Sequence, residues 1–399
     1  MKSDWRVLKL EDFIEFNPRE SIPKGKMAKK VLMGQLQPFT RDISSYEVSP
    51  FNGGSKFRNG DTLMARITPC LENGKTAQVN ILDAGEVGFG STEFIVMRAK
   101  PGISDKDFIY YLALSTQLRE IAIKSMVGSS GRQRVQEGVL KNIEILVPPL
   151  DEQIEIGHTL RILDDKIAIN NAINQHLEQI AQAIFKSWFV DFEPFGGEMP
   201  SDWREVPLGE VVEISTKTMN PQSCSDIILE HYSIPAFDEN RLPVFELASE
   251  IKSNKYIVDK NCFLISKLNP DKKRIWRPYC ISSHPVCSTE FMVYRAKNPA
   301  HKDFYYAVID SPAFTDFLLS HITGSTGSRQ RAIPSETLSF TVVIPTDDII
   351  DCFCDKVAAI YAQFEQNYLE NLRLRQIRNT LLPRLMSGEL SVADLEYIT

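Results

Sequence analysis

Local clusters of lysine and arginine are the residues of this sequence best suited to a chemical task, the binding of phosphate groups. The 399-residue chain has a net charge of −7 at pH 7 and a pI near 5.6, which argues against a general attraction to polyanions. Its basic residues nevertheless gather in residues 24–30 and again in residues 267–277. Much of the acid falls in segments expected to be helical, where charges usually face solvent. The overall charge therefore leaves room for local phosphate-binding surfaces.

Motifs for nucleotide binding and catalysis fail at the positions their chemistry requires. The run Gly74-Lys75-Thr76 resembles the end of a P-loop, but Pro69 stands where the phosphate cradle needs its first glycine. Residues 88–90 lack the third glycine of a dinucleotide-binding fingerprint. The sequence has no HExxH, no GxSxG and no Asp/Asn-Pro-Pro-aromatic motif. We therefore expect no catalytic centre and no bound cofactor in this chain.

The cysteines and the hydropathy pattern predict a reduced, non-membrane protein. None of the seven cysteines forms a CxxC pair, so neither a disulfide framework nor a zinc site is expected. No run of about 18 apolar residues occurs, and the N-terminal residues lack a secretory hydrophobic stretch. We expect a cytoplasmic location and no membrane partner.

Four sequence islands recur in the same order at nearly one offset, which indicates a duplicated domain rather than a solenoid. Three islands are 197 or 198 residues apart, and the fourth, GSSGRQR, returns as GSTGSRQR with one added residue. The pairs are residues 4–6 and 202–204, 91–100 and 288–297, 128–134 and 324–331, and 147–148 and 344–345.

Each copy begins as a mixed arm and ends in a long helix. Strand-like runs alternate with turn signals in each arm, and short helices are expected at residues 106–115 and 302–309. The predicted fold is a duplicated α/β (α+β) protein with two arms, two long antiparallel coiled-coil helices and pseudo-twofold symmetry. The predicted segments are a first arm (1–148), a central helix (149–191), a linker with the second arm (192–345), a distal helix (346–386) and a tail (387–399).

The two long helices carry matching seams of buried-type residues in steps of four and three. This spacing is typical of a coiled coil, in which polar asparagines fix the register. At about 1.5 Å per residue each helix spans roughly 55–60 Å, and Pro383 is expected to end the second. Two independent amphipathic helices, each packed on its own arm, are the alternative. The helix-pairing candidates are Asn170, Asn174, Asn367 and Asn371.

The order of these features resembles the specificity subunits of Type I restriction–modification enzymes over essentially the whole chain. The resemblance is carried by GDTLMARITP (60–69) and its counterpart FLISKLNP (263–270), and by VPPLDEQ (147–153), IFKSWFVDF (184–192) and LLPRLMSGE (381–389). One departure is PTDD (345–348), which replaces the Pro-Leu-x-Glu-Gln form before the second helix.

The resemblance implies that each arm is a target recognition domain reading one half of a bipartite site in double-stranded DNA. The paired helices then act as a spacer and dock two methyltransferase subunits, with restriction–translocase subunits as further partners. S-adenosylmethionine, ATP and Mg are expected in those partners, and no catalysis is expected here. One chain with two divergent arms can read an asymmetric site, which a homodimer cannot.

Residues that are similar between the arms are candidates for phosphate contacts, and divergent residues are candidates for base reading. The repeated arginines could instead pair with acids of their own arm, and the basic–aromatic run at residues 272–277 could be a solvated hairpin. The phosphate candidates are Arg66, Arg132, Arg134, Lys267, Lys272, Lys273, Arg274, Arg277, Arg329 and Arg331. The base-reading candidates are Gln35, Gln37, Arg41, Asp238, Asn240 and Arg241.

Two other functions fit the sequence. One is the recognition subunit of a bifunctional Type II-like enzyme whose catalytic centre lies on another polypeptide. The other is a coiled-coil scaffold that binds proteins and no DNA.

Overall fold

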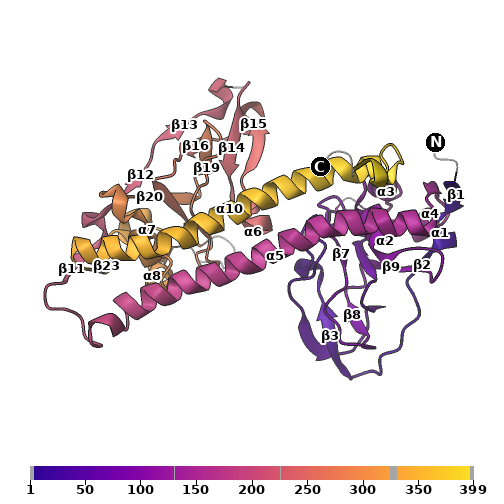
Figure 1. Ribbon diagram of the computed structural model, residues 1–399, viewed down its shortest axis with the longest axis horizontal. Coiled ribbons are helices and arrows are strands. Elements are labelled where there is room, and N and C mark those ends of the chain that lie inside the picture. The colour runs from indigo at the N-terminus through magenta and orange to yellow at the C-terminus, as the bar shows by residue number, and fades with distance from the viewer. Residues whose placement is uncertain (1–3, 130, 225, 324–329, 396–399) are drawn as a thin grey trace. The chain divides into compact units, whose positions relative to one another are not determined.

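The computed structural model describes residues 4–129, 131–224, 226–323 and 330–395, which fall into two compact units (Figure 1). Unit 1 comprises Met1–Ile169 and Glu370–Thr399, and unit 2 comprises Asn170–Leu369. Each unit therefore holds one arm together with half of each long helix. Unit 1 therefore combines two stretches that are far apart in the sequence, because each long helix divides its contacts between the two arms.

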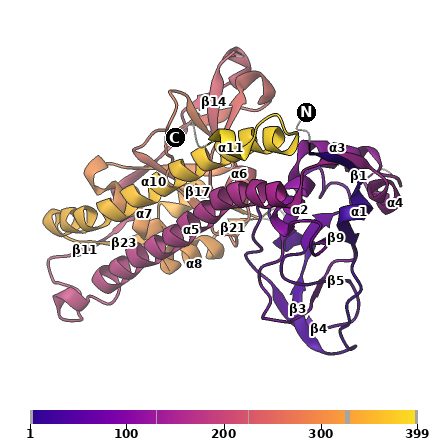
Figure 2. The ribbon, with the colours of Figure 1, turned by 45° about the vertical axis from the view of Figure 1, so that its right-hand side comes forward.

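The arm of unit 1 contains two four-stranded sheets. One has the order β2-β9-β6-β7 and the other β4-β3-β8-β5, while β1 and β10 pair separately. Figures 1 and 2 place β3 at the end of this arm that is remote from the part of α5 in the same unit. The strands are β1 (Arg6–Lys9), β2 (Ile14–Phe16), β3 (Met27–Val31), β4 (Glu47–Pro50), β5 (Ser55–Phe57), β6 (Thr62–Ala65), β7 (Thr76–Gln78), β8 (Gly88–Gly90), β9 (Phe94–Ala99) and β10 (Glu144–Val147). The short helices are α1 (Leu10–Phe13), α2 (Lys106–Leu114), α3 (Thr116–Lys124), α4 (Glu137–Lys141) and α11 (Val392–Leu395).

The arm of unit 2 repeats this plan. Its sheets have the orders β12-β20-β17-β18 and β13-β16-β19-β14-β15, and β11 pairs with β23 as β21 does with β22. The strands are β11 (Arg204–Pro207), β12 (Val212–Ser215), β13 (Thr218–Met219), β14 (Ile228–Tyr232), β15 (Val244–Leu247), β16 (Lys255–Ile257), β17 (Cys262–Ser266), β18 (Ile275–Trp276), β19 (Pro285–Ser288), β20 (Phe291–Ala296), β21 (Ile322–Thr323), β22 (Arg331–Ala332) and β23 (Thr341–Ile344). The short helices are α6 (Ile234–Asn240), α7 (Lys302–Ile309), α8 (Pro312–Ser320) and α9 (Pro334–Thr337).

Corresponding strands pair in the same sense in both arms. In each arm a central strand, β9 or β20, has antiparallel neighbours on both sides, and one parallel pair, β3–β8 or β14–β19, lies in the other sheet. The continuous apolar runs at residues 94–97 in β9 and 291–294 in β20 are buried on both faces of their sheets, since all eight residues are buried. The duplicated, mixed fold class predicted from the sequence is confirmed.

The two long helices are α5 (Leu150–Phe189) and α10 (Asp347–Met386). All eighteen positions of the two seams are buried or half-buried, namely Ile156, Leu160, Leu163, Ile167, Asn170, Asn174, Leu177, Ala181 and Ile184 in α5, and Phe353, Val357, Ile360, Phe364, Asn367, Asn371, Leu374, Arg378 and Leu381 in α10. The expectation that Pro383 ends the second helix is wrong, because the chain stays helical to Met386 and Ser387 N donates to Pro383 O at 3.1 Å. A proline in the last turn removes only one backbone donor and leaves its own carbonyl free to accept.

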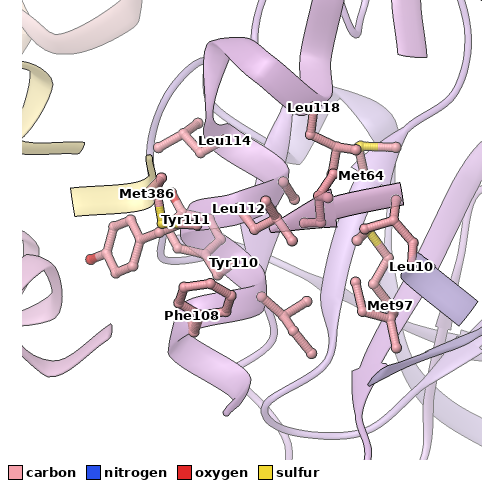
Figure 3. Packing of buried hydrophobic residues seen from close by; sticks show 14 of the residues in the cluster. Leu10, Met64, Met97, Phe108, Tyr110, Tyr111, Leu112, Leu114, Leu118 and Met386 are labelled. Carbon is pink, nitrogen blue, oxygen red and sulfur yellow. The ribbon is translucent and has the colours of Figure 1, made fainter. Parts of the chain in front are cut away.

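Within each unit the two helices run antiparallel. In unit 2, Asn174 contacts Asn367 and Phe185 lies near Phe353, so one helix ascends as the other descends. In unit 1 the core joins both helices to the arm, and Met386 of α10 packs beside Tyr110 and Tyr111 of α2 (Figure 3). The alternative of helices that pack only on their own arms is therefore wrong.

Two kinds of feature are absent from the residues that the structure describes. No helix among them combines the length and apolar character needed to cross a bilayer. No group of three or more His, Cys, Asp or Glu side chains within the described ranges is placed to hold a metal ion.

Candidate nucleic-acid interface

The same basic–acidic cluster occurs once in each unit, built from the islands that the sequence repeats. In unit 1 the Arg134 guanidinium donates to both carboxylate oxygens of Glu93 at 2.6–3.0 Å, and Arg66 Nε lies 3.6 Å from Glu93. In unit 2 Arg331 donates to Glu290 at 3.1 Å through Nε and Nη2. We call these the Arg134 and Arg331 clusters.

Backbone hydrogen bonds fix both clusters in one geometry. In unit 1 the strand-end residue Arg66 donates its N–H to Glu93 O at 2.9 Å, and in unit 2 Lys267 donates to Glu290 O at 2.9 Å. The loop carrying the arginine then returns to the same strand end in each unit. The matching bonds are Val135 N to Arg66 O (2.8 Å), Thr68 N to Gln133 O (3.0 Å), Ala332 N to Lys267 O (2.9 Å) and Asn269 N to Gln330 O (2.8 Å).

Electrostatics favour the ionised form of the Arg134 cluster. The hydrogen bond from Arg134 is the main reason that the pKa of Glu93 is lowered, and the same pair raises the pKa of Arg134. Side-chain exposure is 44% for Arg134 and 46% for Arg331. The carboxylate therefore orients a guanidinium that is still open to solvent, where a phosphate oxygen can reach it.

The pairing of each arginine with an acid of its own arm, one of the two interpretations left open by the sequence, is thus present in the structure. It does not remove the other interpretation, because a half-exposed arginine can serve two anions. Arg132 is exposed beside the Arg134 cluster. Arg329 lies outside the described residues.

Two candidate base readers instead tie an arm to a long helix. Arg41 is only 8% exposed and donates to Asp165 of α5 at 2.5 Å as well as to Asp42. Arg241 lies 3.2 Å from Glu178 of α5 and stacks on Phe237. Both arginines therefore have an anchoring contact with α5, and the base-reading role expected for Arg41 and Arg241 stays a prediction.

The basic–aromatic run of the second arm is folded inward rather than displayed. Arg274 is 4% exposed and forms a bidentate pair with Asp238, and Trp276 is buried. Lys273 pairs with Asp310 at 2.7 Å, and Arg277 pairs with Asp303. Arg274 and Trp276 are therefore part of the folded arm, while Lys272 and Lys273 are exposed, and the DNA contact expected for the run stays a prediction. Lys272 is exposed and forms no ion pair with the residues that the structure describes.

The remaining candidates lie at partly exposed positions. Gln37 is half-buried, while the Gln35 side chain accepts from Leu32 N at 2.7 Å and Asn240 accepts from Leu242 N at 3.0 Å. The last two amide oxygens stabilise local turns. Gln37 is consequently the base-reading candidate whose polar end is least committed by the contacts described above.

Sequence reasoning missed a buried ion pair between the helices of unit 1. Arg378 Nη1 donates to Asp164 Oδ1 at 2.6 Å, and Tyr111 donates its hydroxyl to Asp164 Oδ2 at 2.7 Å. Arg378 occupies a position of the apolar seam, and that mismatch was the available signal for a buried partner. The helix-pairing asparagines Asn174 and Asn367 do meet within unit 2.

Comparisons with known proteins agree with this architecture. Residues 2–179 match the family model described as the Type I restriction modification DNA specificity domain. The chain is 26% identical to the Type I restriction enzyme HindI specificity subunit of Haemophilus influenzae, over 88% of this chain and 90% of that one. It is 25% identical to the MjaIX specificity subunit of Methanocaldococcus jannaschii, over 98% and 95%. The crystal structure of a Type-I restriction-modification system S subunit from M. genitalium has the same fold, with a TM-score of 0.54, 16% identity and coverage of 96% and 97%.

Proposed function

Because the chain belongs to the family of Type I restriction–modification specificity subunits, we propose that its two arms each read one half of a bipartite DNA site. The chain recognises a DNA target, assembles with other subunits and has no catalytic role of its own. The observation that carries the two-arm proposal is the duplicated cluster, with Arg134 in one unit and Arg331 in the other.

The clusters are proposed to hold the DNA backbone. An arginine oriented by a carboxylate presents its remaining N–H groups at a fixed angle, which suits a phosphate oxygen and carries no sequence information. Arg66, Arg132, Lys267 and Lys272 supplement this positive surface, and Arg329 is proposed to do so from the repeat of the sequence alone. Base reading is assigned to residues that differ between the arms, with Gln37 as the leading candidate because an amide can bond adenine in two places.

The partner subunits are proposed to supply the chemistry. Two methyltransferase subunits, one for each half of the pseudo-symmetric chain, would carry S-adenosylmethionine. Restriction subunits would carry ATP and Mg. We place the complex in the cytoplasm, with the DNA that it modifies. The long helices α5 and α10 are proposed to set the length of the unspecified gap between the half-sites.

Methylome sequencing of cells that carry this chain with its methyltransferase tests the proposal. The expected motif is bipartite and asymmetric, with methylated adenines in both halves. Replacing residues 199–345 with the corresponding arm of a relative should change one half-site and leave the other intact. A change in both half-sites would contradict the two-arm proposal. A methyltransferase complex with no footprint on DNA would instead favour a protein scaffold.

A further inference from the structure

The ion pair between Arg378 and Asp164 is the feature of the seam that distinguishes the two halves of the chain. The Asp164 and Arg378 side chains are 6% and 3% exposed. Tyr111 donates to the aspartate, and Arg378 Nη1 also donates to Phe39 O at 3.2 Å. The arm of unit 1 thus closes over a charge pair that joins α5 to α10.

The two equivalent positions in unit 2 do not form an ion pair, and Arg277 lies over one of their side chains, 3.9 Å from the Tyr361 ring centroid. The residue 197 positions after Asp164 is Tyr361, and the residue 197 positions before Arg378 is Ala181. Tyr361 and Ala181 line one small cavity of about 10 Å³ together with Tyr306. An aromatic side chain and a methyl group therefore replace the carboxylate and the guanidinium.

The seam asparagines cannot tell the helices apart, because they occupy equivalent positions in both. Asn174 of α5 pairs with Asn367 of α10 in unit 2. If α5 met a second α5 in this register, Asn170 would stand in the place of Asn367 and the amide pair would survive. The ion pair would not survive. In a pair of two α5 helices, Asp164 of one helix would face Ala181 of the other. In a pair of two α10 helices, Arg378 of one helix would face Tyr361 of the other.

We propose that the Asp164–Arg378 pair selects the pairing of α5 with α10 and rejects the corresponding half of a second copy of this chain. Each like-with-like pairing buries a charge without its partner, which weakens such an association roughly hundredfold or more. The selection keeps two different arms in one particle. It concerns helix pairing alone, so it holds or fails independently of what the arms bind.

A nicked full-length chain provides the test. Residues 196–199 are exposed and carry Gly196 and Gly197 at positive φ, so a protease site inserted after Gly197 can be cut in the folded protein. Isotopically labelled and unlabelled nicked chains are mixed, dissociated in urea, returned to buffer and counted by native mass spectrometry. For the natural sequence we expect pairs of two N-terminal or two C-terminal halves to make up only a few per cent of the pairs.

Two variants remove the difference between the halves from opposite directions. Asp164→Tyr with Arg378→Ala gives unit 1 the residues of unit 2, and Tyr361→Asp with Ala181→Arg does the reverse. Each double variant should raise the fraction of pairs made of two N-terminal or two C-terminal halves at least severalfold. The second double variant provides the test if the first does not fold.

The matched control is the exposed pair of Lys166 and Glu370, 3.4 Å apart and about half exposed. Lys166→Gln with Glu370→Ile gives these positions the residues of the other half. The fraction of like-with-like pairs should nevertheless stay unchanged, because exposed ion pairs contribute little to the stability of helix pairing. The proposal would be overturned if both double variants kept the wild-type fraction of like-with-like pairs, or if that fraction rose as much in the control.

Discussion

Asn367 Nδ2 donates a hydrogen bond to Asn174 Oδ1 at 2.8 Å, between two buried side chains of facing helices. The second partner of each amide is also fixed. Asn174 Nδ2 reaches Phe364 O at 3.4 Å, and Gln363 Nε2 donates to Asn367 Oδ1 at 2.8 Å. A satisfied amide pair inside an apolar seam specifies the register, because sliding either helix would leave buried polar atoms without partners.

Asn367→Leu should therefore destabilise unit 2. The substitution leaves Asn174 Oδ1 buried without its donor, which costs about 1–3 kcal/mol of unfolding free energy. Asn174→Leu combined with Asn367→Leu should recover most of that loss, since both partners become apolar. Urea denaturation measures the free energies, and Gln366→Leu, at an exposed position of the same helix, is the control. A double variant no better than the single one would contradict the paired role.

Arg134→Ala and Arg331→Ala should weaken DNA binding to a similar extent on any sequence. Each removes one phosphate contact, so the slope of log affinity against log salt should fall by about one. Binding is measured on the complex with methyltransferase subunits, at several salt concentrations. Lys124→Ala, which removes a well-exposed lysine of unit 1, is the control. An unchanged salt slope in both arginine variants would leave the clusters as purely structural ion pairs.

The periodic features of this protein could be predicted from its sequence, whereas the long-range pairs could not. The repeat and the seam at Asn174 and Asn367 follow from spacing along the sequence alone. The pairing of Arg41 with Asp165 of α5 could not be foreseen, because the two residues lie 124 positions apart and no local pattern marks such a pair. The same holds for the pairing of Arg274 with Asp238, which comes from α6.

Arg41→Ala and Gln37→Ala should separate anchoring from recognition. Arg41 is buried between two aspartates, so its loss should lower unfolding free energy by about 1–3 kcal/mol while the methylated motif stays the same. Gln37→Ala should leave stability within about 0.5 kcal/mol and relax one base of the first half-site. Thermal unfolding and methylome sequencing of both variants give the two readouts. If Arg41→Ala altered the motif at unchanged stability, the anchoring role would be refuted.

Thiol labelling should follow burial. Burial raises the pKa of Cys262 to about 11, and it raises the pKa of Cys287 as well, whereas Cys224 and Cys352 are exposed. Since the thiolate is the nucleophile, iodoacetamide at pH 8 should modify Cys224 and Cys352 first and spare Cys262 and Cys287 until the protein unfolds. The protonated buried thiol also favours the folded state below about pH 9, and this contribution is lost as pH rises toward 11. Peptide mass spectrometry identifies the sites, and early labelling of Cys262 would contradict the packing of β17.

Matched insertions test whether the helices set the gap between half-sites. Four residues added after Ala172 in α5 and four after Leu369 in α10 lie at equivalent places, 197 residues apart, and leave the Asn174–Asn367 pair within unit 2. The insertions lengthen each helix by about 6 Å, and B-DNA rises about 3.4 Å per base pair, so the gap should grow by one or two pairs. Four residues overshoot the 3.6-residue turn by about 40°, which the seam can absorb by slight overwinding.

Two-residue insertions at the same places are the control, because they turn the apolar stripe by about 200° and should abolish helix pairing and methylation. The measurement is the methylated motif. Both half-sites should persist in the four-residue variant with a longer unspecified gap. An active four-residue variant that keeps its original gap would show that α5 and α10 serve as a docking surface without determining the spacing.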